Sequence, residues 1–223
     1  MKDNNMKLYG YFRSSASYRV RIALNLKGLE YELVAVHLVK NGGEQFFEAY
    51  RALNPDALVP VLQDSFEGEA VTLTQSLAII EYLDEVYPEV SLLPAHPLQR
   101  AHVRALALSI ACEIHPINNL RVLKYLSGTL KVSDEQKNAW YRHWCEEGLA
   151  TLEQKLSLAP QTGRFCFGDT PGLADCFLVP QIANAQRFNC DLSGMPVLMR
   201  IHQACIEHPA FVRAAPANQA DAE

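Results

Sequence analysis

The hydrophobic pattern of residues 6–87 alternates between strand-like and helix-like stretches. Apolar and aromatic residues fill 6–12 and 30–36, as in β-strands, and the stretch between them has the apolar spacing of a helix. Two serines precede that helix and Gly28 ends it, which are common start and stop signals. The chain therefore opens β-α-β, with a parallel strand pair and a right-handed crossover. The further expected elements are a helix near 46–53, strands at 58–62 and 70–73, and a helix at 77–87.

This order, βαβαββα, predicts one small α/β domain over 6–87. Pro60 lies inside the expected strand 58–62. Because proline cannot donate to a strand ladder, the site is an edge strand, a bulge or a cis turn.

A second type of pattern begins after a segment rich in proline, residues 88–97, which is the expected domain boundary. Beyond it, 98–218 is helical throughout, so an all-helical domain should follow the α/β domain. Pro116 should kink the first of these helices, because it lacks an N–H and clashes with the preceding turn. The later helices are expected near 134–158, 172–188 and 195–207.

Composition narrows the class of protein. The chain has 223 residues, 49% of them hydrophobic and 20% charged, with a formal net charge of -5. It has no block of Lys and Arg and no apolar run of membrane-spanning length, so neither nucleic acid nor a membrane is an expected partner. Residues 1–5 are polar and lack the apolar segment of a signal peptide, so we expect a short disordered leader and a cytoplasmic protein.

Six cysteines all lie in the second half of the chain. None form a C-x-x-C pair, and the histidines lack the spacing of metal ligands, so no metal site is predicted. Without a secretion signal, a disulfide framework is not expected. The cysteines are instead interpreted as reduced side chains packed as small hydrophobes.

Candidate chemistry lies where the first strand passes into the first helix, at Ser14-Ser15. A helix N-terminus offers free N–H groups and partial positive charge, which stabilise a nearby thiolate. The simpler alternative is that these serines only cap the helix. Arg19 and Arg21 lie two apart on this helix and so face different directions; one is expected near the site and the other in a structural ion pair.

Two further positions fit the binding of a peptide-like ligand. A cis bond between Val59 and Pro60 would turn the backbone of Val59 toward such a ligand, the alternative being an ordinary edge-strand proline. Gln75-Ser76 opens the next helix, where N–H groups can hold a carboxylate. The alternative there is a plain helix cap, supplied by Ser76 or Thr74.

Several of these segments also match a family signature. They are 14–24, 52–55 with 59–60, 75–83, 116–119, 168–175, 178–181 and 184–188. On these residues the chain resembles the glutathione transferase superfamily over nearly its whole length. Within it, the chain is most similar to the zeta class, which contains the maleylacetoacetate and maleylpyruvate isomerases.

The resemblance implies an α/β plus all-α fold: a thioredoxin-like glutathione-binding domain over 6–87 and an all-helical substrate-binding domain over 98–218. It also implies glutathione as cofactor. The cofactor-binding residues that it implies are Ser14, Ser15, Gln45, Val59, Pro60, Gln75 and Ser76. By this resemblance Ser14 donates to the glutathione thiolate with help from Ser15, and both count as catalytic. The backbone of Val59 would pair with the cysteinyl part, and Gln75 with Ser76 would hold the γ-glutamyl end.

For the remaining roles, the resemblance implies that Gln45 touches the glycyl end of glutathione. It implies that Arg187 binds a carboxylate of a small diacid, with Arg13 and His115 as further candidates for the same pocket. Ala16 departs from the family, which often has cysteine there, and leaves the extent of transferase side activity open.

Three functions follow as expectations from this resemblance. The first is glutathione-dependent cis-trans isomerisation of maleylacetoacetate or maleylpyruvate in the breakdown of aromatic compounds. The second is glutathione transfer to small electrophiles or α-halo acids. The third is a non-catalytic binding protein on the same fold, since a fold does not fix a function. A homodimer is expected from the family alone.

Overall fold

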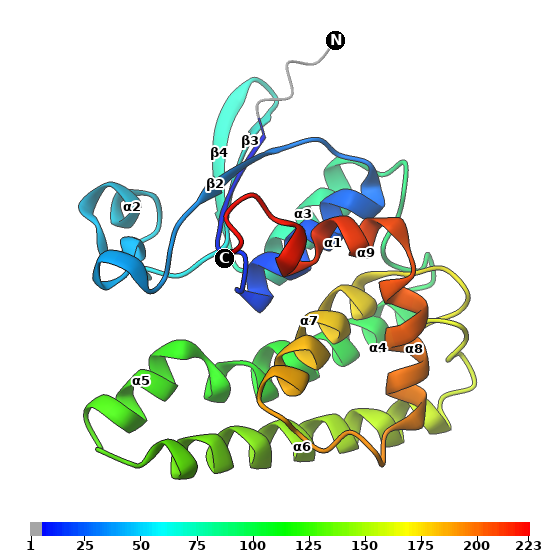
Figure 1. The fold of residues 1–223 in the computed structure, drawn as a ribbon. Coiled ribbons are helices and arrows are strands. Elements are labelled where there is room, and N and C mark those ends of the chain that lie inside the picture. The colour runs from blue at the N-terminus through cyan, green and yellow to red at the C-terminus, as the bar shows by residue number, and fades with distance from the viewer. Residues whose placement is uncertain (1–5) are drawn as a thin grey trace. The chain divides into compact units, whose positions relative to one another are not determined.

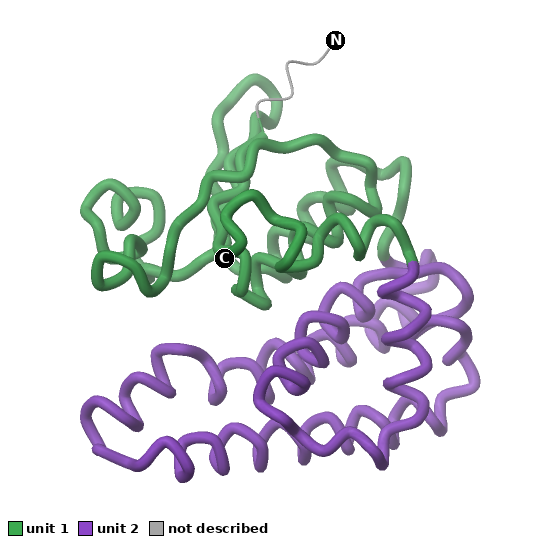
Figure 2. Tube along the Cα trace, in the orientation of Figure 1, with its two compact units in different colours: residues 1–92, 208–223 green, residues 93–207 purple. Residues whose placement is uncertain are grey.

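The computed structural model describes residues 6–223 and divides into two compact units. The first unit runs to Leu92 and also includes His208–Glu223, and the second is Leu93–Glu207 (Figure 2). The predicted leader, residues 1–5, lies outside the described residues.

A four-stranded sheet forms the centre of the first unit (Figure 1). Its strands are β1 (Lys7–Gly10), β2 (Glu32–Ala35), β3 (Val61–Phe66) and β4 (Glu69–Thr74), in the order β2-β1-β3-β4. β1 pairs with β2 in parallel, as the β-α-β pattern predicts, and the other pairs are antiparallel. One row of leucines crosses all four strands in register: Leu33, Leu8, Leu62 and Leu73.

The third strand differs from its prediction in position. β3 begins at Val61, so Pro60 precedes the strand and does not interrupt it. The Val59–Pro60 bond is cis, which agrees with one of the three alternatives. The edge-strand alternative is wrong, because β3 lies between β1 and β4.

Four helices accompany the sheet in the first unit: α1 (Ser15–Lys27), α2 (Glu48–Leu53), α3 (Ser76–Val86) and α9 (Pro209–Ala214). α1 packs against α3 and α9, and it is buried on almost every side. Gly28 ends α1 in the left-handed conformation at φ 67°, which glycine adopts without steric cost. The fully buried apolar side chains contribute about 1.5–3 kcal/mol each. They include Leu8, Val20, Ile22, Leu24, Leu62, Ile79 and Leu83.

The helix α9 was not predicted, and it places the end of the chain in the first unit. Asn25 Nδ2 donates to the Ala210 carbonyl at 3.0 Å, and Arg21 Nε donates to the Ala214 carbonyl at 3.0 Å. Residues 208–218, which the sequence assigns to the helical domain, therefore belong with the α/β unit.

The second unit is helical. Its elements are α4 (Pro97–Leu108), a π-helical turn (Ser109–Ile114), a 3-10 turn (Pro116–Asn118), α5 (Leu120–Gly128), α6 (Asp134–Leu158), α7 (Leu173–Arg187) and α8 (Pro196–Ile206). The interruption before Pro116 agrees with the predicted kink. α7 is buried at every position from Leu173 to Ile182, so it forms the core of this unit.

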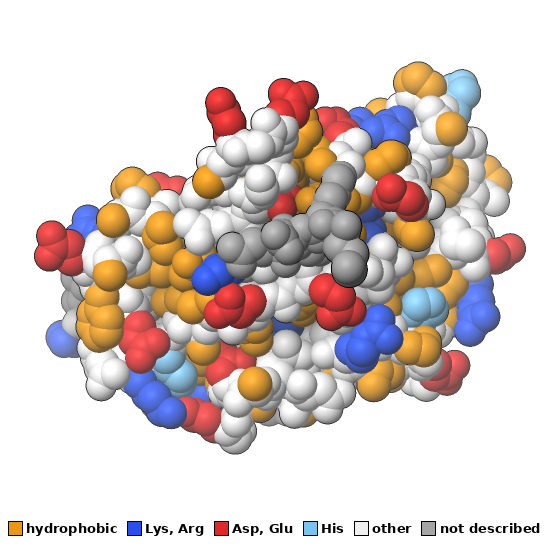
Figure 3. Space-filling model, turned by 90° about the horizontal axis from the view of Figure 1, so that it is seen from above, with side chains coloured by type: hydrophobic (Ala, Val, Ile, Leu, Met, Phe, Trp, Pro, Cys, Tyr) orange, Lys and Arg blue, Asp and Glu red, His pale blue; other side chains and the backbone are white. Residues whose placement is uncertain are grey.

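Within residues 6–223, no helix combines the length and apolar character needed to cross a bilayer. On the face drawn in Figure 3, Lys and Arg side chains stand apart, with acidic and uncharged side chains between them.

Candidate active site

The start of α1 has the geometry that the serine pair predicts. Ser14 is the N-cap residue, and its Oγ accepts a hydrogen bond from the Ser17 N–H at 3.2 Å. The Ser14 N–H donates to the Tyr11 carbonyl at 2.9 Å, which fixes the turn between β1 and the helix. A hydroxyl can donate one hydrogen bond while it accepts others, so the Ser14 proton can serve an external anion. Ser15, the first residue of the helix, is buried.

A second helix start lies in the same unit. Ser76 is the first residue of α3 and is buried, and Gln75 before it is exposed with φ 68°. Neither Thr74 nor Ser76 caps this helix, so that prediction is wrong. The reason is that β4 continues through Thr74, which leaves Gln75 alone to make the turn.

Arg19 connects the two helix starts. Its Nη1 donates to Ser76 Oγ at 3.2 Å, and its side chain is 2% exposed, so a buried cation lies between the first turns of α1 and α3. Of the two arginines on α1, Arg19 is therefore the one that reaches a predicted site residue, Ser76. A buried positive charge next to two helix N-termini makes this region favourable for an anion.

Arg21 has a structural role, but within residues 6–223 it makes hydrogen bonds to backbone carbonyls and not the expected ion pair. Besides Ala214, it donates to the carbonyls of Tyr11 at 3.4 Å and Phe12 at 3.0 Å. Burial lowers the pKa of Arg21 to about 10. The residue thus holds the segment before Ser14 against the end of α9.

Two loops complete the group of predicted residues in the first unit. Gln45 lies in a short 3-10 turn and is buried, and its Oε1 has no hydrogen-bond partner in the part of the chain that the structure describes. Val59 is half-buried and packs against the cluster of Val36, Tyr50 and Val61. A buried amide oxygen without a partner is costly unless a ligand or water satisfies it.

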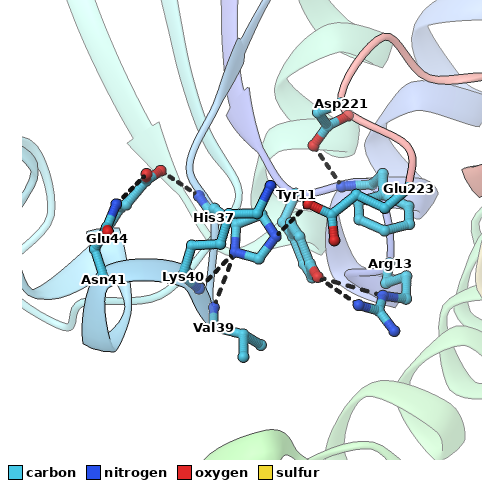
Figure 4. A network of polar contacts seen from close by, with 10 residues as sticks. Tyr11, Arg13, His37, Val39, Lys40, Asn41, Glu44, Asp221 and Glu223 are labelled. Atoms are coloured by element: carbon cyan, nitrogen blue, oxygen red, sulfur yellow. Dashed lines mark hydrogen bonds and ion pairs between the residues drawn. The ribbon is translucent and has the colours of Figure 1, made fainter.

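The C-terminal segment reaches the same unit at two points (Figure 4). Asp221 Oδ2 accepts from the Phe12 N–H at 3.0 Å. The Glu223 side chain forms an ion pair with Lys40 and lies 3.5 Å from His37 Nε2. The hydrogen bond from Lys40 lowers the pKa of the Glu223 carboxyl. These contacts lie beside the segments that lead to Ser14 and Gln45, and sequence reasoning missed them because no motif marks them.

The three predicted substrate ligands each have a local partner. Arg13 is exposed and donates to the Tyr11 hydroxyl at 3.1 and 3.3 Å. In the second unit, Arg187 ends α7, is exposed, and donates through Nη2 to Asn184 Oδ1 at 3.2 Å.

His115 lies in the same unit as Arg187, between the π-helical turn and the 3-10 turn, with Nε2 3.4 Å from Asn119 Nδ2. Over residues 6–223, no group of three or more His, Cys, Asp and Glu side chains is arranged to hold a metal ion.

Known proteins match this chain closely. Residues 8–91 match the family model for the glutathione S-transferase N-terminal domain. A probable maleylacetoacetate isomerase of Vibrio cholerae is 54% identical over 96% of this chain and 97% of its own. A holo structure of maleyl pyruvate isomerase, described as a bacterial zeta-class glutathione S-transferase, has TM-score 0.91 and 49% identity over 97% of this chain and all of its own. The chain belongs to the zeta class of the glutathione transferases.

A further similar structure carries a ligand. The maleylacetoacetate isomerase of Anaeromyxobacter dehalogenans, solved with glutathione in its active site, has TM-score 0.89 and 43% identity, with both chains fully covered. The thioredoxin-like domain and the helical domain expected from the family are the two types of unit found here, so the predicted fold is confirmed.

Proposed function

We propose that this protein is a glutathione-dependent cis-trans isomerase that converts a small maleyl-type diacid to its fumaryl isomer. Relatives at 50% identity or more are named both probable maleylacetoacetate isomerase and maleylpyruvate isomerase, which supports the reaction and leaves two diacids. The observation that carries the proposal is the N-terminus of α1, where the Ser14 Oγ accepts one hydrogen bond at the positive end of the helix and its hydroxyl can donate another to an anion.

The residues of the first unit fit glutathione as cofactor. The tripeptide offers amide N–H groups to the unsatisfied Gln45 Oε1, and carboxylates that suit the α3 N-terminus beside Arg19 and Ser76. When bound, glutathione supplies a thiolate for reversible addition to the double bond of the substrate.

This chain's own residues prepare that step. Ser14 donates a hydrogen bond to the sulfur, and the positive end of α1 lowers the pKa of the thiol. Ser15 assists, the backbone of Val59 orients the cysteinyl part, and Gln75 holds the γ-glutamyl end.

Arg187 is the proposed ligand for a substrate carboxylate, with Arg13 and His115 as supporting candidates. A guanidinium binds a carboxylate through two parallel hydrogen bonds, which a lysine cannot reproduce. A cation there also stabilises the negative charge that develops on the diacid during addition. The homodimer stays a prediction from the family, and the cytoplasmic location stays a prediction from the sequence.

The test is conversion of maleylpyruvate and maleylacetoacetate with a trace of glutathione, while the free thiol is titrated. Isomer formation with the thiol unchanged supports the proposal. Loss of one thiol per product would instead identify a transferase, and conversion of neither diacid would also reject the proposal.

A matched pair of variants tests the carboxylate ligand. Arg187→Ala should raise the KM about tenfold or more, the value of a charge-assisted hydrogen bond. Arg164→Ala is the control, because both arginines are exposed and each lies over the phenyl ring of the next residue. The distance from the guanidinium carbon Cζ to the ring centroid is 5.1 Å for Arg187 and 5.6 Å for Arg164. Equal KM values for the two variants would exclude Arg187 from the diacid site.

A further inference from the structure

One peptide group links Asp221, near the end of the chain, to Ser14. The N–H of Phe12 donates to Asp221 Oδ2 at 3.0 Å (Figure 4). The carbonyl of Tyr11, in the same peptide group, accepts the Ser14 N–H at 2.9 Å. Because a peptide group is planar and stiff, its N–H and its carbonyl move together. The orientation that Asp221 gives to this group therefore also sets the direction of the hydrogen bond from Ser14.

Arg21 holds the same segment from the side of α1. Its Nη1 donates to the Tyr11 carbonyl at 3.4 Å, and its Nη2 donates to the Phe12 carbonyl at 3.0 Å. Hydrogen bonds to charged groups are stronger than neutral ones, so a guanidinium and a carboxylate fix this backbone from two sides. Phe12 is 5% exposed, and a buried N–H that loses its acceptor must change its position or find another partner.

The segment that carries Asp221 is anchored on both sides of it. Before Asp221, Gln219 Nε2 donates to two backbone carbonyls at the end of α9, at 2.8 and 3.0 Å. After it, Glu223 forms the ion pair with Lys40, whose side chains are 43% and 61% exposed. Exposed ion pairs contribute little to stability, so Asp221 should stay in place without this pair.

We propose that Asp221 is a positioning residue for the glutathione-dependent reaction, because it fixes the peptide group against which the Ser14 turn closes. The inference rests on the proposed function, in which the Ser14 hydroxyl donates to the sulfur of glutathione. A displacement of about 1 Å in a catalytic arrangement can lower the rate about 100-fold. Asp221 thus acts on the reaction through the backbone of residues 11–14.

The simpler alternative is that Asp221 only docks the end of the chain on the first unit. Glu223 separates the two interpretations, because it docks the same segment but has no hydrogen bond to residues 11–14 among those found in residues 6–223. Asp221 is half-buried, so its replacement should leave the unit folded, whereas Arg21 is fully buried and is not a suitable variant.

The test compares Asp221→Ala, Asp221→Asn and Glu223→Gln in the full chain. With saturating glutathione, the kcat for the diacid should fall about 10- to 100-fold in Asp221→Ala, with a smaller change in KM. Asp221→Asn should stay close to the wild type, because its amide oxygen still accepts the Phe12 N–H. Glu223→Gln should keep the wild-type kcat.

A second readout needs no diacid. The ultraviolet absorbance of the thiolate, followed with pH, gives the pKa of the thiol of bound glutathione. This pKa should be raised in Asp221→Ala and unchanged in Asp221→Asn and Glu223→Gln, because a displaced Ser14 stabilises the thiolate less. Hydrogen exchange of the Phe12 amide should be faster in Asp221→Ala, which reports the lost bond directly.

The outcomes separate this inference from the proposed function. If Asp221→Ala keeps the kcat and the thiol pKa of the wild type, the inference is wrong and the isomerase proposal stands. An equal loss in Asp221→Asn or Glu223→Gln would also overturn it, since the bond to Phe12 would not be the cause. If the wild type converts neither diacid, the isomerase proposal fails, and the thiol pKa values still decide whether Asp221 positions Ser14.

Discussion

The two serines that begin α1 and α6 make the same capping bond in very different surroundings. Ser14 Oγ accepts from the Ser17 N–H at 3.2 Å, and Ser133 Oγ accepts from the Gln136 N–H at 3.2 Å. At α6 the cap is reciprocal, because Gln136 Oε1 accepts from the Ser133 N–H at 2.9 Å. At α1 the Ser14 N–H is used by the preceding turn instead.

The difference in charge between these helix starts separates a structural cap from a site. The first turn of α6 contains Asp134 and Glu135, which offset the positive end of the helix. The first turn of α1 has no acidic residue, and Arg19 is buried next to it. The positive end of α1 is therefore not offset by an acidic side chain in its first turn, whereas that of α6 is offset by two.

The largest expected effect comes from Ser14→Ala compared with Ser133→Ala. The first change removes the hydroxyl that donates to the sulfur, so turnover should fall about 100- to 1000-fold, as for other lost charge-stabilising donors. The second should leave turnover unchanged. Steady-state kinetics with saturating glutathione measures both. Equal turnover in the two variants would show that Ser14, like Ser133, only caps its helix.

The start of α7 sharpens the comparison, because there the N-cap residue is Gly172 and an acidic residue at the third helical position, Asp175, accepts the Gly172 N–H. Asp175 is 1% exposed, and its carboxylate accepts from the Gly172 N–H at 2.8 Å and the Cys166 N–H at 2.9 Å. Asp175→Ala leaves both donors unsatisfied in the core of the second unit. We expect the free energy of unfolding to fall by about 3 kcal/mol in urea denaturation.

The matched control for that variant is Asp191→Ala. Asp191 is exposed and accepts one backbone bond, from the Ser193 N–H at 2.9 Å, and water can replace it. Its loss should cost less than about 1 kcal/mol. A cost for Asp191 as large as that for Asp175 would show that burial does not determine the value of these hydrogen bonds from backbone N–H groups to carboxylates.

These caps also show what the sequence can and cannot predict. The position of Ser14 between a strand and a helical pattern was enough to place the α1 start, and the uninterrupted helical stretch near 134–158 predicted α6 at its observed bounds. The six residues of α9 are too few to show a helical period, and its place depends on Arg21 and Asn25.

The geometry of the candidate site could be predicted only in part, for similar reasons. Ser14, Ser76 and the Val59–Pro60 bond lie in local motifs, so sequence reasoning reached them. The bond from Arg19 to Ser76 and the carbonyl partners of Arg21 depend on segments that meet only in the folded chain. Every residue has a backbone carbonyl, so the sequence does not indicate which carbonyls will accept hydrogen bonds from an arginine.

The stability of the second unit should depend on pH through a buried histidine. His202 on α8 is 6% exposed, and burial lowers its pKa below the ordinary value of 6.5. The folded state then binds fewer protons than the unfolded state, so stability is complete above about pH 6.5 and falls as the pH decreases toward the folded pKa. Each pKa unit of the shift corresponds to about 1.4 kcal/mol.

Urea denaturation across this pH range measures the effect. His202→Gln should flatten the fall in stability below pH 6.5. His143→Gln is the control, because His143 is exposed and pairs at 3.4 Å with Glu147 on the helix surface. If the fall in stability persists in the His202 variant and disappears in the His143 variant, the titrating group is His143 and the prediction is wrong.

The smallest expected effect concerns the capping box of α6 itself. Ser133→Ala should lower the free energy of unfolding by about 0.5–1 kcal/mol, and Gln136→Ala by a few tenths, because both side chains are exposed and water replaces part of each bond. Since each residue satisfies the other's backbone N–H, the double variant should cost less than the sum of the two single variants. Strict additivity in urea denaturation would show that the two bonds form independently, and the α6 cap would then be a simple one like that of Ser14.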